Sequence, residues 1–168
     1  MKQRPYLTRA LNLLDPILEV PRGSLPAQQD ATGAEAMFWK AGSAGWLPEG
    51  FGVKFYYCAL NRDYAWNRQK LAHKNGFAPK TGQRVDAIAE DGGRLCGYMT
   101  EVAEKDRTKD YQLAEEHREG LKRIYRQTFG SKARDIRGAN IGRIDGKVVM
   151  IDFGPLTDQD RVWAARNT

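Results

Sequence analysis

The sequence has no long apolar run, which bears first on membranes and secretion. A helix that crosses a bilayer needs roughly 20 consecutive apolar residues, and no stretch of the 168 residues approaches that length. The N-terminus starts with basic residues, but Asp15 and Pro16 interrupt its apolar part and no small-residue cleavage site follows. We therefore expect no membrane span and no signal peptide, in a chain whose length suits one domain with a short extension.

Cysteine and histidine are scarce, with two residues of each. Cys58 and Cys96 lie far apart in the sequence, so we expect buried or half-buried thiols rather than a disulfide or a pair of metal ligands. Neither His73 nor His117 has a Cys or His neighbour at ligand spacing, which argues against a zinc site. This usage of cysteine suits the reducing cytoplasm, where we expect the protein to act.

Acidic residues are scarce in the first half of the chain. The formal net charge of +6 arises within residues 1–84, because residues 85–168 contain equal numbers of basic and acidic residues. A basic region attracts polyanions, including nucleic acids and the phosphates of a nucleotide. No arginine-rich block or pattern of stacked aromatic residues accompanies this charge, so we favour a solvated basic face and keep nucleic-acid binding as the weaker alternative.

The hydrophobic pattern predicts helices and strands in alternation. Helical spacing occurs over residues 6–20, 63–74 and 108–130, and β-branched or aromatic runs predict strands over residues 36–41, 52–60, 83–90, 94–102 and 148–151. Turn formers fill residues 21–33, and further turns or helix ends are expected at Asn75-Gly76, Asp91-Gly92-Gly93, Gly130 and Asp145-Gly146. This order of elements predicts an α+β fold without internal repeats.

Three polar residues near the C-terminus have a spacing that suits phosphoryl transfer. Asp135 precedes Asn140 by five residues, and Asp152 follows Asn140 by twelve, directly after a predicted buried strand. Phosphoryl transfer needs a carboxylate that orients or deprotonates the acceptor hydroxyl, and it needs oxygen ligands for Mg²⁺. Taken singly, Asn140 suits a turn and Asp135 suits a helix cap. Together, Arg-Asp-x-x-x-x-Asn, a hairpin and Asp-Phe-Gly supply the whole set of groups.

Residues 134–154 resemble the catalytic loop and the Asp-Phe-Gly motif of the protein kinase superfamily. The resemblance extends upstream, in the same order, so that it covers residues 31–155. Similar segments are the glycine-loop strand pair at 33–41, the strand with the phosphate-binding lysine at 52–55, the end of the regulatory helix at 71–80 and the hinge at 97–104.

The resemblance implies a two-lobed, protein-kinase-like fold of the α+β class. An antiparallel sheet with one helix would form the N-lobe over residues 31–102. Residues 103–168 would form a much reduced C-lobe with the long helix, the catalytic loop and the hairpin, and residues 1–30 a helical extension and connector. Only fourteen residues follow Gly154, so we expect neither an activation segment nor the large helical lobe that docks peptides in this family.

The resemblance also implies ATP and Mg²⁺ as cofactors and gives individual residues their roles. Lys54 would neutralise the nucleotide phosphates, and Asp135 would orient or deprotonate the acceptor hydroxyl. Arg137 occupies the place where many kinases have a lysine that contacts the transferred phosphate. Asn140 and Asp152 would hold Mg²⁺.

Adenine and the phosphate loop are assigned in the same way. Gly33 is the one glycine that remains of the usual glycine loop. Met99 would stand at the entrance of the hinge. The main chain of Glu101, Val102 and Ala103 would offer hydrogen-bonding groups to adenine.

One departure from the family concerns the partner of Lys54. Kinases pair this lysine with a glutamate of the regulatory helix, but the helix predicted over residues 63–74 has Asp63 as its only acid, at its start. Two other acids are available, Asp152 in the metal-free state and Glu35 on the preceding strand. We expect Asp152 to be the partner, because the Asp-Phe-Gly acid ordinarily faces this lysine across the phosphate site.

Three functional hypotheses remain at this point. An ATP- and Mg²⁺-dependent phosphotransferase is favoured, because Lys54, Asp135, Asn140 and Asp152 are all present. A pseudokinase that binds a nucleotide or a partner protein is the alternative, and a small basic nucleic-acid-binding protein is the third. The compact chain would also suit an effector encoded by a phage or mobile element, and we expect a protein as its substrate or target.

Overall fold

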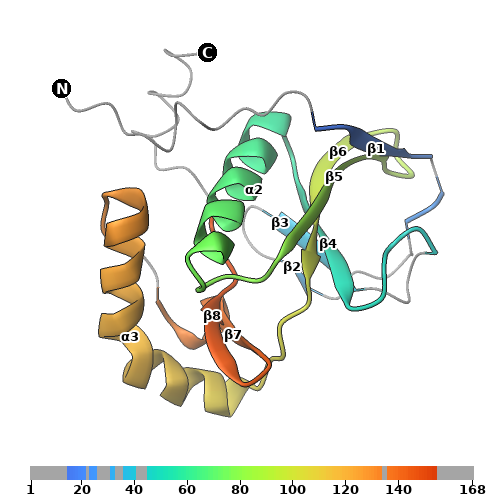
Figure 1. Cartoon of the computed structure of the whole chain (residues 1–168). Coiled ribbons are helices and arrows are strands. Elements are labelled where there is room, and N and C mark those ends of the chain that lie inside the picture. Colours follow the sequence, from blue (N-terminus) through green and yellow to red (C-terminus); the bar gives the residue numbers. More distant parts are fainter. Residues whose placement is uncertain are drawn as a thin grey trace.

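A computed structural model of the chain describes residues 15–21, 23–25, 31–32, 36–40, 45–133 and 136–154. Within these residues, two α-helices, a six-stranded sheet and a two-stranded sheet form a mixed α+β structure (Figure 1). This agrees with the α+β class expected from the sequence. None of the helices in the described ranges is long and apolar enough to cross a membrane.

The larger sheet has its strands in the order β1-β5-β6-β4-β3-β2. Their bounds are Ile17–Val20 for β1, Ala31–Thr32 for β2, Ala36–Lys40 for β3, Phe51–Tyr56 for β4, Thr81–Ile88 for β5 and Arg94–Glu101 for β6. Neighbouring strands from β5 to β2 are antiparallel, whereas β1 lies parallel to β5. Within residues 31–102 the sheet is therefore antiparallel, as expected, and the additional strand β1 makes the whole sheet mixed.

Strand β1 also corrects the prediction of a helix over residues 6–20. Ile17–Val20 pairs with β5, and Val20 is buried in the core of the sheet. The segment that follows Pro16 is short, and proline itself has no main-chain N–H to donate, so pairing with β5 outweighs the helical spacing. Residues 6–14 lie outside the described residues.

The elements in the middle of the chain match their predictions closely. Helix α2 (Ala59–Lys74) starts before the expected Asp63 and ends at Asn75-Gly76, where Gly76 has a φ of 81°. The turn between β5 and β6 is formed by Asp91-Gly92-Gly93, and Gly92 has a φ of 87°. Both glycines are in a region of φ that other residues rarely adopt, which explains why these two turns were visible in the sequence.

Helix α3 (Arg107–Phe129) has a capping residue at each end. The Asp106 carboxylate accepts hydrogen bonds from the main-chain N–H groups of Thr108 and Lys109. Gly130 follows the last turn with a φ of 69°. Carboxylates at the start and glycine just after the end are the preferred caps of a helix, so the bounds of α3 agree with the sequence prediction.

A two-stranded hairpin follows α3. Strands β7 (Ile141–Ile144) and β8 (Lys147–Met150) are joined by Asp145-Gly146, where both φ angles are positive, at 49° and 78°. Positive φ at both turn residues is required by the tight hairpin turn that Asp-Gly favours. A single 3₁₀ turn, η1 (Gly138–Asn140), precedes β7. The predicted hairpin is confirmed.

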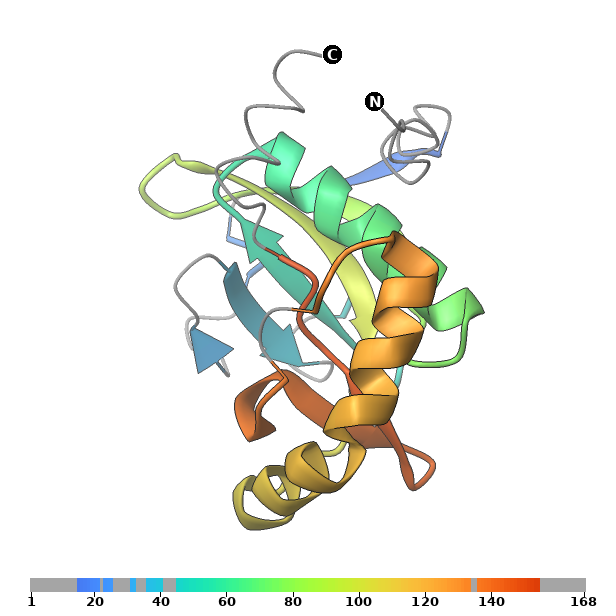
Figure 2. The same cartoon turned by 90° about the vertical axis from the view of Figure 1, so that its left-hand side faces the viewer.

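Helix α2 lies between the large sheet and the part of the molecule formed by α3 and the hairpin (Figures 1 and 2). The end of α2 shares a core with α3 and the hairpin, formed by Ala72, Phe77, Ala78, Ala114, Leu121, Tyr125, Phe129, Ile136, Ile141, Met150 and Phe153. The main-chain N–H of Met150 donates to the Phe77 carbonyl at 2.9 Å. The chain after β8 is thereby brought to the helix face of the large sheet, where it meets Lys54 of β4.

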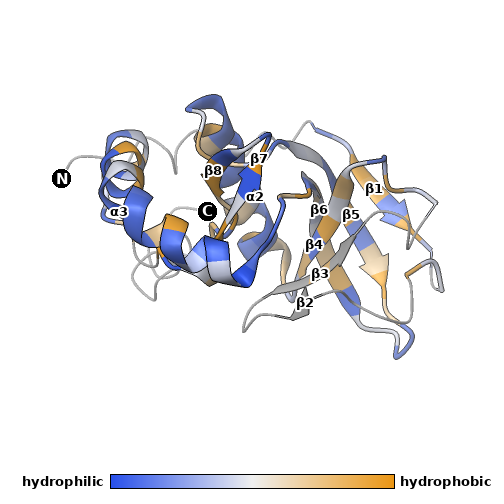
Figure 3. Ribbon diagram, turned by 90° about the horizontal axis from the view of Figure 1, so that it is seen from below, coloured by the Kyte–Doolittle hydropathy of each residue, from blue (hydrophilic) through white to orange (hydrophobic). Residues whose placement is uncertain are grey.

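Strands of the large sheet contain both hydrophobic and hydrophilic residues (Figure 3). Successive strand residues point to opposite sides, so the two faces of the sheet differ in chemistry. The apolar face, away from α2, is formed by Val20, Val53, Phe55, Val85, Ala87, Leu95 and Met99, with Leu47 packed on them. The helix face, under α2, has Lys54, Tyr56, Arg84, Asp86, Tyr98 and Thr100. Tyr56 and Tyr98 stack there and pack against Ala65 and Trp66 of α2.

Candidate functional site

Lys54 of β4 meets the chain that follows β8. Its Nζ lies 3.2 Å from Oδ1 of Asp152 and donates to the Ile151 carbonyl at 3.3 Å. Lys54 and Asp152 are 98 positions apart in the sequence. The lysine side chain is 16% exposed and the aspartate side chain 40% exposed, so the pair lies partly open to solvent. The expectation that Asp152 pairs with Lys54 is confirmed.

The surroundings of Lys54 keep its ammonium charged. Burial alone would lower the pKa of Lys54, but the charge and the hydrogen bond of Asp152, together with Tyr98, outweigh it and leave the pKa above its ordinary value. Tyr98 lies beside Lys54 in the sheet register, and burial raises the pKa of its phenol well above the ordinary range. The site thus combines the Lys54 cation with a neutral Tyr98 phenol, beside the partly exposed Asp152.

The Asp-Phe-Gly turn is fixed on both sides of Asp152. Phe153 is buried, with its ring centroid 6.2 Å from that of Phe77 and 6.3 Å from that of Phe129. The Gly154 N–H donates to Asp152 Oδ1 at 3.2 Å. A Cβ on Gly154 would lie 3.2 Å from the ring of Tyr56, so only a residue without a side chain fits easily at this contact. The aromatic core therefore determines where the Asp152 carboxylate points.

Asn140 lies next to this turn through the main chain. It is the last residue of η1, and its carbonyl accepts from the Ile151 N–H at 3.0 Å. The two residues that were expected to hold Mg²⁺, Asn140 and Asp152, are thus on adjacent segments. Their amide and carboxylate oxygens are ligands that Mg²⁺ accepts, and phosphate and water oxygens usually complete its shell. No group of three or more His, Cys, Asp or Glu side chains that could bind a metal occurs among the described residues.

Lys105 binds the turn η1, which ends at Asn140, and the sequence analysis did not predict this interaction. The Lys105 ammonium donates to the carbonyls of Gly138, at 2.7 Å, and Ile141. It also lies 3.1 Å from the carboxylate of Asp110, which is fully buried at the start of α3. Nothing in the spacing of charges pointed to this arrangement, because a lysine beside a helix start ordinarily faces solvent.

In the hinge segment, the side chain and the main-chain N–H groups that remain open to a ligand differ from those predicted. The register pairs Met99 with Val53, and Met99 is packed in the apolar face, away from Lys54. The main-chain N–H of Glu101 donates to Lys80, and that of Val102 donates to the Gly50 carbonyl at 2.9 Å. Of the three hinge residues, two have therefore already used their N–H groups within the fold.

Ala103 is the exception in this segment. Its main-chain N–H and carbonyl form no hydrogen bond with any residue that the structure describes. On the helix face, Thr100 follows Tyr98 toward the hinge and lies opposite Gly52. Of the described residues that were expected to meet adenine, Ala103 alone therefore keeps both main-chain groups open, whereas Thr100 is buried and accepts a hydrogen bond from Gln69 at 2.7 Å.

Of the remaining predicted site residues, the structure describes only Arg137. Asp135 and Gly33 lie outside the described residues. Arg137 is exposed and directly precedes η1. Ile136, between Asp135 and Arg137, is buried in the core of α3 and the hairpin, so the loop is anchored at this point.

Helix α2 presents no carboxylate to Lys54. Its one acid, Asp63, is bound by Arg62 and by Arg84, whose Nη1 lies 3.1 Å from it. One turn further along the helix, Arg68 donates to the Phe153 carbonyl at 2.8 Å. The helix therefore contacts the Asp-Phe-Gly turn directly and leaves Lys54 to Asp152.

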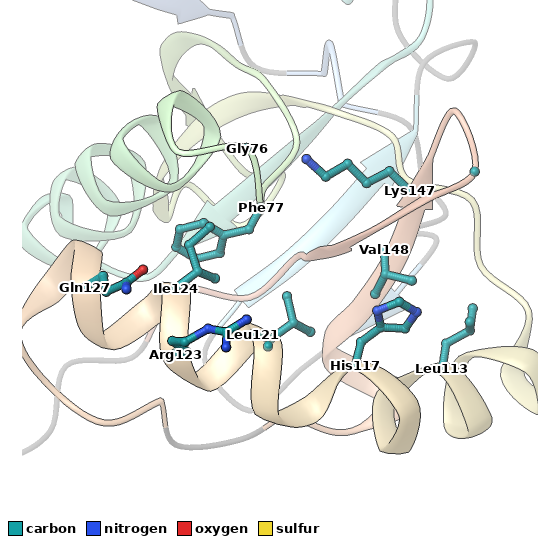
Figure 4. A pocket seen from close by; sticks show the side chains of 12 residues that line it. Gly76, Phe77, Leu113, His117, Leu121, Arg123, Ile124, Gln127, Lys147 and Val148 are labelled. Carbon is teal, nitrogen blue, oxygen red and sulfur yellow. The ribbon is translucent and has the colours of Figure 1, made fainter.

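A surface depression of about 500 Å³ lies elsewhere, between α3, the hairpin and the turn after α2 (Figure 4). Its apolar floor includes Phe77, Leu121 and Val148, and Lys147 and Arg123 lie at its rim. None of the predicted site residues lines it. The depression is therefore separate from the residues that meet around Lys54.

Comparison of the chain with protein-family models, with curated proteins and with solved structures gave no match.

Proposed function

We propose that this protein is an ATP- and Mg²⁺-dependent phosphotransferase with a reduced protein-kinase-like fold. The observation that carries the proposal is the contact of Lys54 with Asp152, 3.2 Å apart and 98 positions apart in the sequence. A cation on the central sheet that faces a carboxylate at the end of a hairpin supplies the two charges that nucleotide phosphates and their metal require. The main-chain hydrogen bond from Ile151 to Asn140 holds Asn140 on the segment beside Asp152, where its side-chain amide would supply a second oxygen ligand.

The proposed chemistry moves one phosphoryl group from ATP to a hydroxyl. The acceptor oxygen forms a bond to the γ-phosphorus, the bond to the β–γ bridging oxygen breaks, and ADP leaves. Asp135 orients the hydroxyl and takes its proton, and Arg137 contacts the transferred group. Lys54 neutralises the phosphates of ATP, and Mg²⁺ held by Asn140 and Asp152 would offset the charge that develops. A protein hydroxyl is the acceptor that we favour.

The alternative of nucleic-acid binding loses support because part of the basic charge is used internally. Two basic side chains of the first half, Arg62 and Arg84, are buried in ion pairs with Asp86 and Asp63. Arg62 is 2% exposed and lies 2.8 Å from Asp86. Charges that are buried in ion pairs cannot neutralise the phosphates of a nucleic acid.

Thermal unfolding with nucleotide provides the first test. A ligand that binds only the native state stabilises it by about 2.7 kcal/mol at 100 times its dissociation constant. We expect ATP with Mg²⁺ to raise the melting temperature and EDTA to reduce the shift. Transfer of label from γ-labelled ATP to the protein itself or to a generic protein substrate is then measured, with Asp152→Asn as the inactive control.

The outcomes separate the hypotheses. A shift together with label transfer that Asp152→Asn abolishes supports the phosphotransferase. A shift without transfer to any acceptor would favour a pseudokinase. No shift at millimolar nucleotide would overturn the nucleotide site and leave a protein-binding module.

A further inference from the structure

The guanidinium of Arg68 lies between α2 and the Asp-Phe-Gly turn. Its Nη1 donates to the carbonyl of Phe153 at 2.8 Å. Phe153 directly follows Asp152, so this hydrogen bond acts on the Phe153–Gly154 peptide, one residue beyond the aspartate that faces Lys54. Arg68 belongs to α2, and Phe153 follows β8. This one side chain therefore connects two segments that are 85 positions apart in the sequence.

Three aromatic rings hold the guanidinium in place. The Arg68 Cζ atom lies 4.6 Å from the ring centroid of Phe129, 5.1 Å from that of Tyr64 and 5.2 Å from that of Tyr125. All three distances are within the range of cation–π attraction. Arginine suits such a position better than lysine, because its planar group stacks on rings while its N–H groups still donate. The donor is thereby oriented before any ligand arrives.

The arrangement differs in kind from a lysine–glutamate pair. A helix glutamate would hold the lysine of the sheet, whereas Asp63, the one acid of α2, is bound to Arg62 and Arg84. Arg68 instead binds the turn that contains Asp152, which is the partner of Lys54. The position of Asp152 at Lys54 thus depends on where α2 sits against α3.

We propose that Arg68 is a positioning residue that couples α2 to the Asp-Phe-Gly turn and keeps the Asp152 carboxylate at Lys54. For catalysis the inference rests on the proposed function, since Asp152 there holds the metal. The helix thereby acts on the site through the acid rather than through the lysine.

The first measurement needs no nucleotide, so it remains informative if the protein does not bind ATP. Amide hydrogen exchange is followed by NMR in the free protein at Ile151, which donates to Asn140, and at Gly154, which donates to Asp152. In Arg68→Gln we expect exchange at both amides to rise roughly tenfold or more, because a charged donor to the turn is lost. Lys70→Gln, on the same helix but exposed and paired with Asp15, is the control and should leave both rates unchanged.

The second measurement is calorimetric titration with ATP, with and without Mg²⁺. Arg68→Gln should lose the part of the affinity that Mg²⁺ adds and keep the affinity measured without metal, since Lys54 is untouched. Arg68→Lys should recover part of the metal effect, because it can still donate but cannot stack in the same way.

Several results would overturn the inference. One is wild-type exchange rates at Ile151 and Gly154 in a folded Arg68→Gln variant. Another is an equal loss of ATP affinity with and without Mg²⁺, which would make Arg68 a general structural residue. If Arg68→Gln does not fold, Arg68→Met, which keeps the packing volume, replaces it. Failure of both to fold would show that Arg68 serves stability and not positioning.

Discussion

Lys54 and Phe55 are neighbours on β4, yet their side chains enter opposite faces of the sheet. Phe55 is fully buried in the apolar face, where Val53, Val85 and Met99 surround it. Lys54 belongs to the helix face, where it contacts Asp152. The apolar face gains its free energy from the removal of apolar surface from water, which requires no particular partner. The helix face depends on individual hydrogen bonds and charge pairs.

The apolar face therefore contributes mainly to stability, whereas the helix face contains Lys54 of the proposed site. Buried polar groups are costly when a partner is lost, so a face built from them tolerates few alternative arrangements. Gln69 of α2 illustrates this, since it donates to Thr100 at 2.7 Å and accepts from the Tyr98 hydroxyl at 2.8 Å. The helix face therefore fixes where α2 lies, and α2 in turn contacts the turn that contains Asp152 through Arg68.

The largest expected effect is on turnover. Asp135→Asn should lower the rate of phosphate transfer by roughly 10²–10⁴ if Asp135 serves as the base, and it should leave the binding of ATP with Mg²⁺ nearly intact. Asp152→Asn should lose transfer and the metal-dependent part of binding together. Steady-state rates and calorimetric affinities of the two variants are compared. Equal loss of binding in both would assign Asp135 a structural role.

Truncation in the apolar face should affect stability far more than ligand binding. Phe55→Ala removes a fully buried ring and should lower the free energy of unfolding by about 3–5 kcal/mol. Urea denaturation measures the change, and ATP affinity is determined at a temperature where the variant is still folded. A loss of affinity as large as that of Lys54→Met would contradict the separation of the two faces.

The ion pairs of the helix face should give stability a dependence on acid pH. Burial opposes the charge of Asp86, but hydrogen bonds from Arg94 and Arg62 outweigh it and hold the pKa below its ordinary value of 3.8. A carboxyl whose pKa is lower in the folded state stabilises fully above the unfolded pKa and loses this contribution as the pH falls through the folded value.

Asp86→Asn is the variant that tests this dependence. It should be less stable than the wild type by about 1–3 kcal/mol near neutral pH, because the buried Arg62 loses a charged partner. The difference should shrink as the pH falls below 3.8. Urea denaturation over a series of pH values gives the comparison, and a difference that stays constant into the acid range would show that charge is not its source.

The smallest expected effect on stability belongs to Lys54→Met. The pair with Asp152 is partly open to solvent, at 16% and 40% exposure, and such pairs contribute about 0–1 kcal/mol. The same variant should clearly weaken the binding of ATP. Denaturation and calorimetry on one preparation measure both quantities. A large loss of stability with unchanged ATP affinity would make Lys54 a structural residue.

Local signals explain which parts of this fold were predictable from sequence. The hairpin at Asp145-Gly146 and the end of α3 at Gly130 follow from positive φ angles that few residues adopt. The contact of Lys54 with Asp152 was anticipated from a motif and its spacing. The hairpin and the helix end depend on a few neighbouring residues. The Lys54–Asp152 contact was predicted because its sequence motif is known from other proteins.

The features that were missed depend on tertiary pairing. Ile17–Val20 becomes a strand only because β5 offers a partner. Met99 faces away from Lys54 because of the register of β4 and β6, which a strand pattern does not fix to the residue. Arg68 and Lys105 have no motif at all, and their roles follow from carbonyls that lie 85 and 33 positions away.

Paramagnetic broadening tests the central claim most directly, because it locates the metal–nucleotide complex on the protein. Mn²⁺ replaces Mg²⁺ with ATP, and the NMR amide signals are compared with those in Mn²⁺ alone. The account predicts that ATP with Mn²⁺ broadens the signals of Lys54, Asn140 and Gly154 first, and that Asp152→Asn removes the effect. Broadening centred on Phe77 and Val148 in the surface depression, or no broadening that requires ATP, would contradict it.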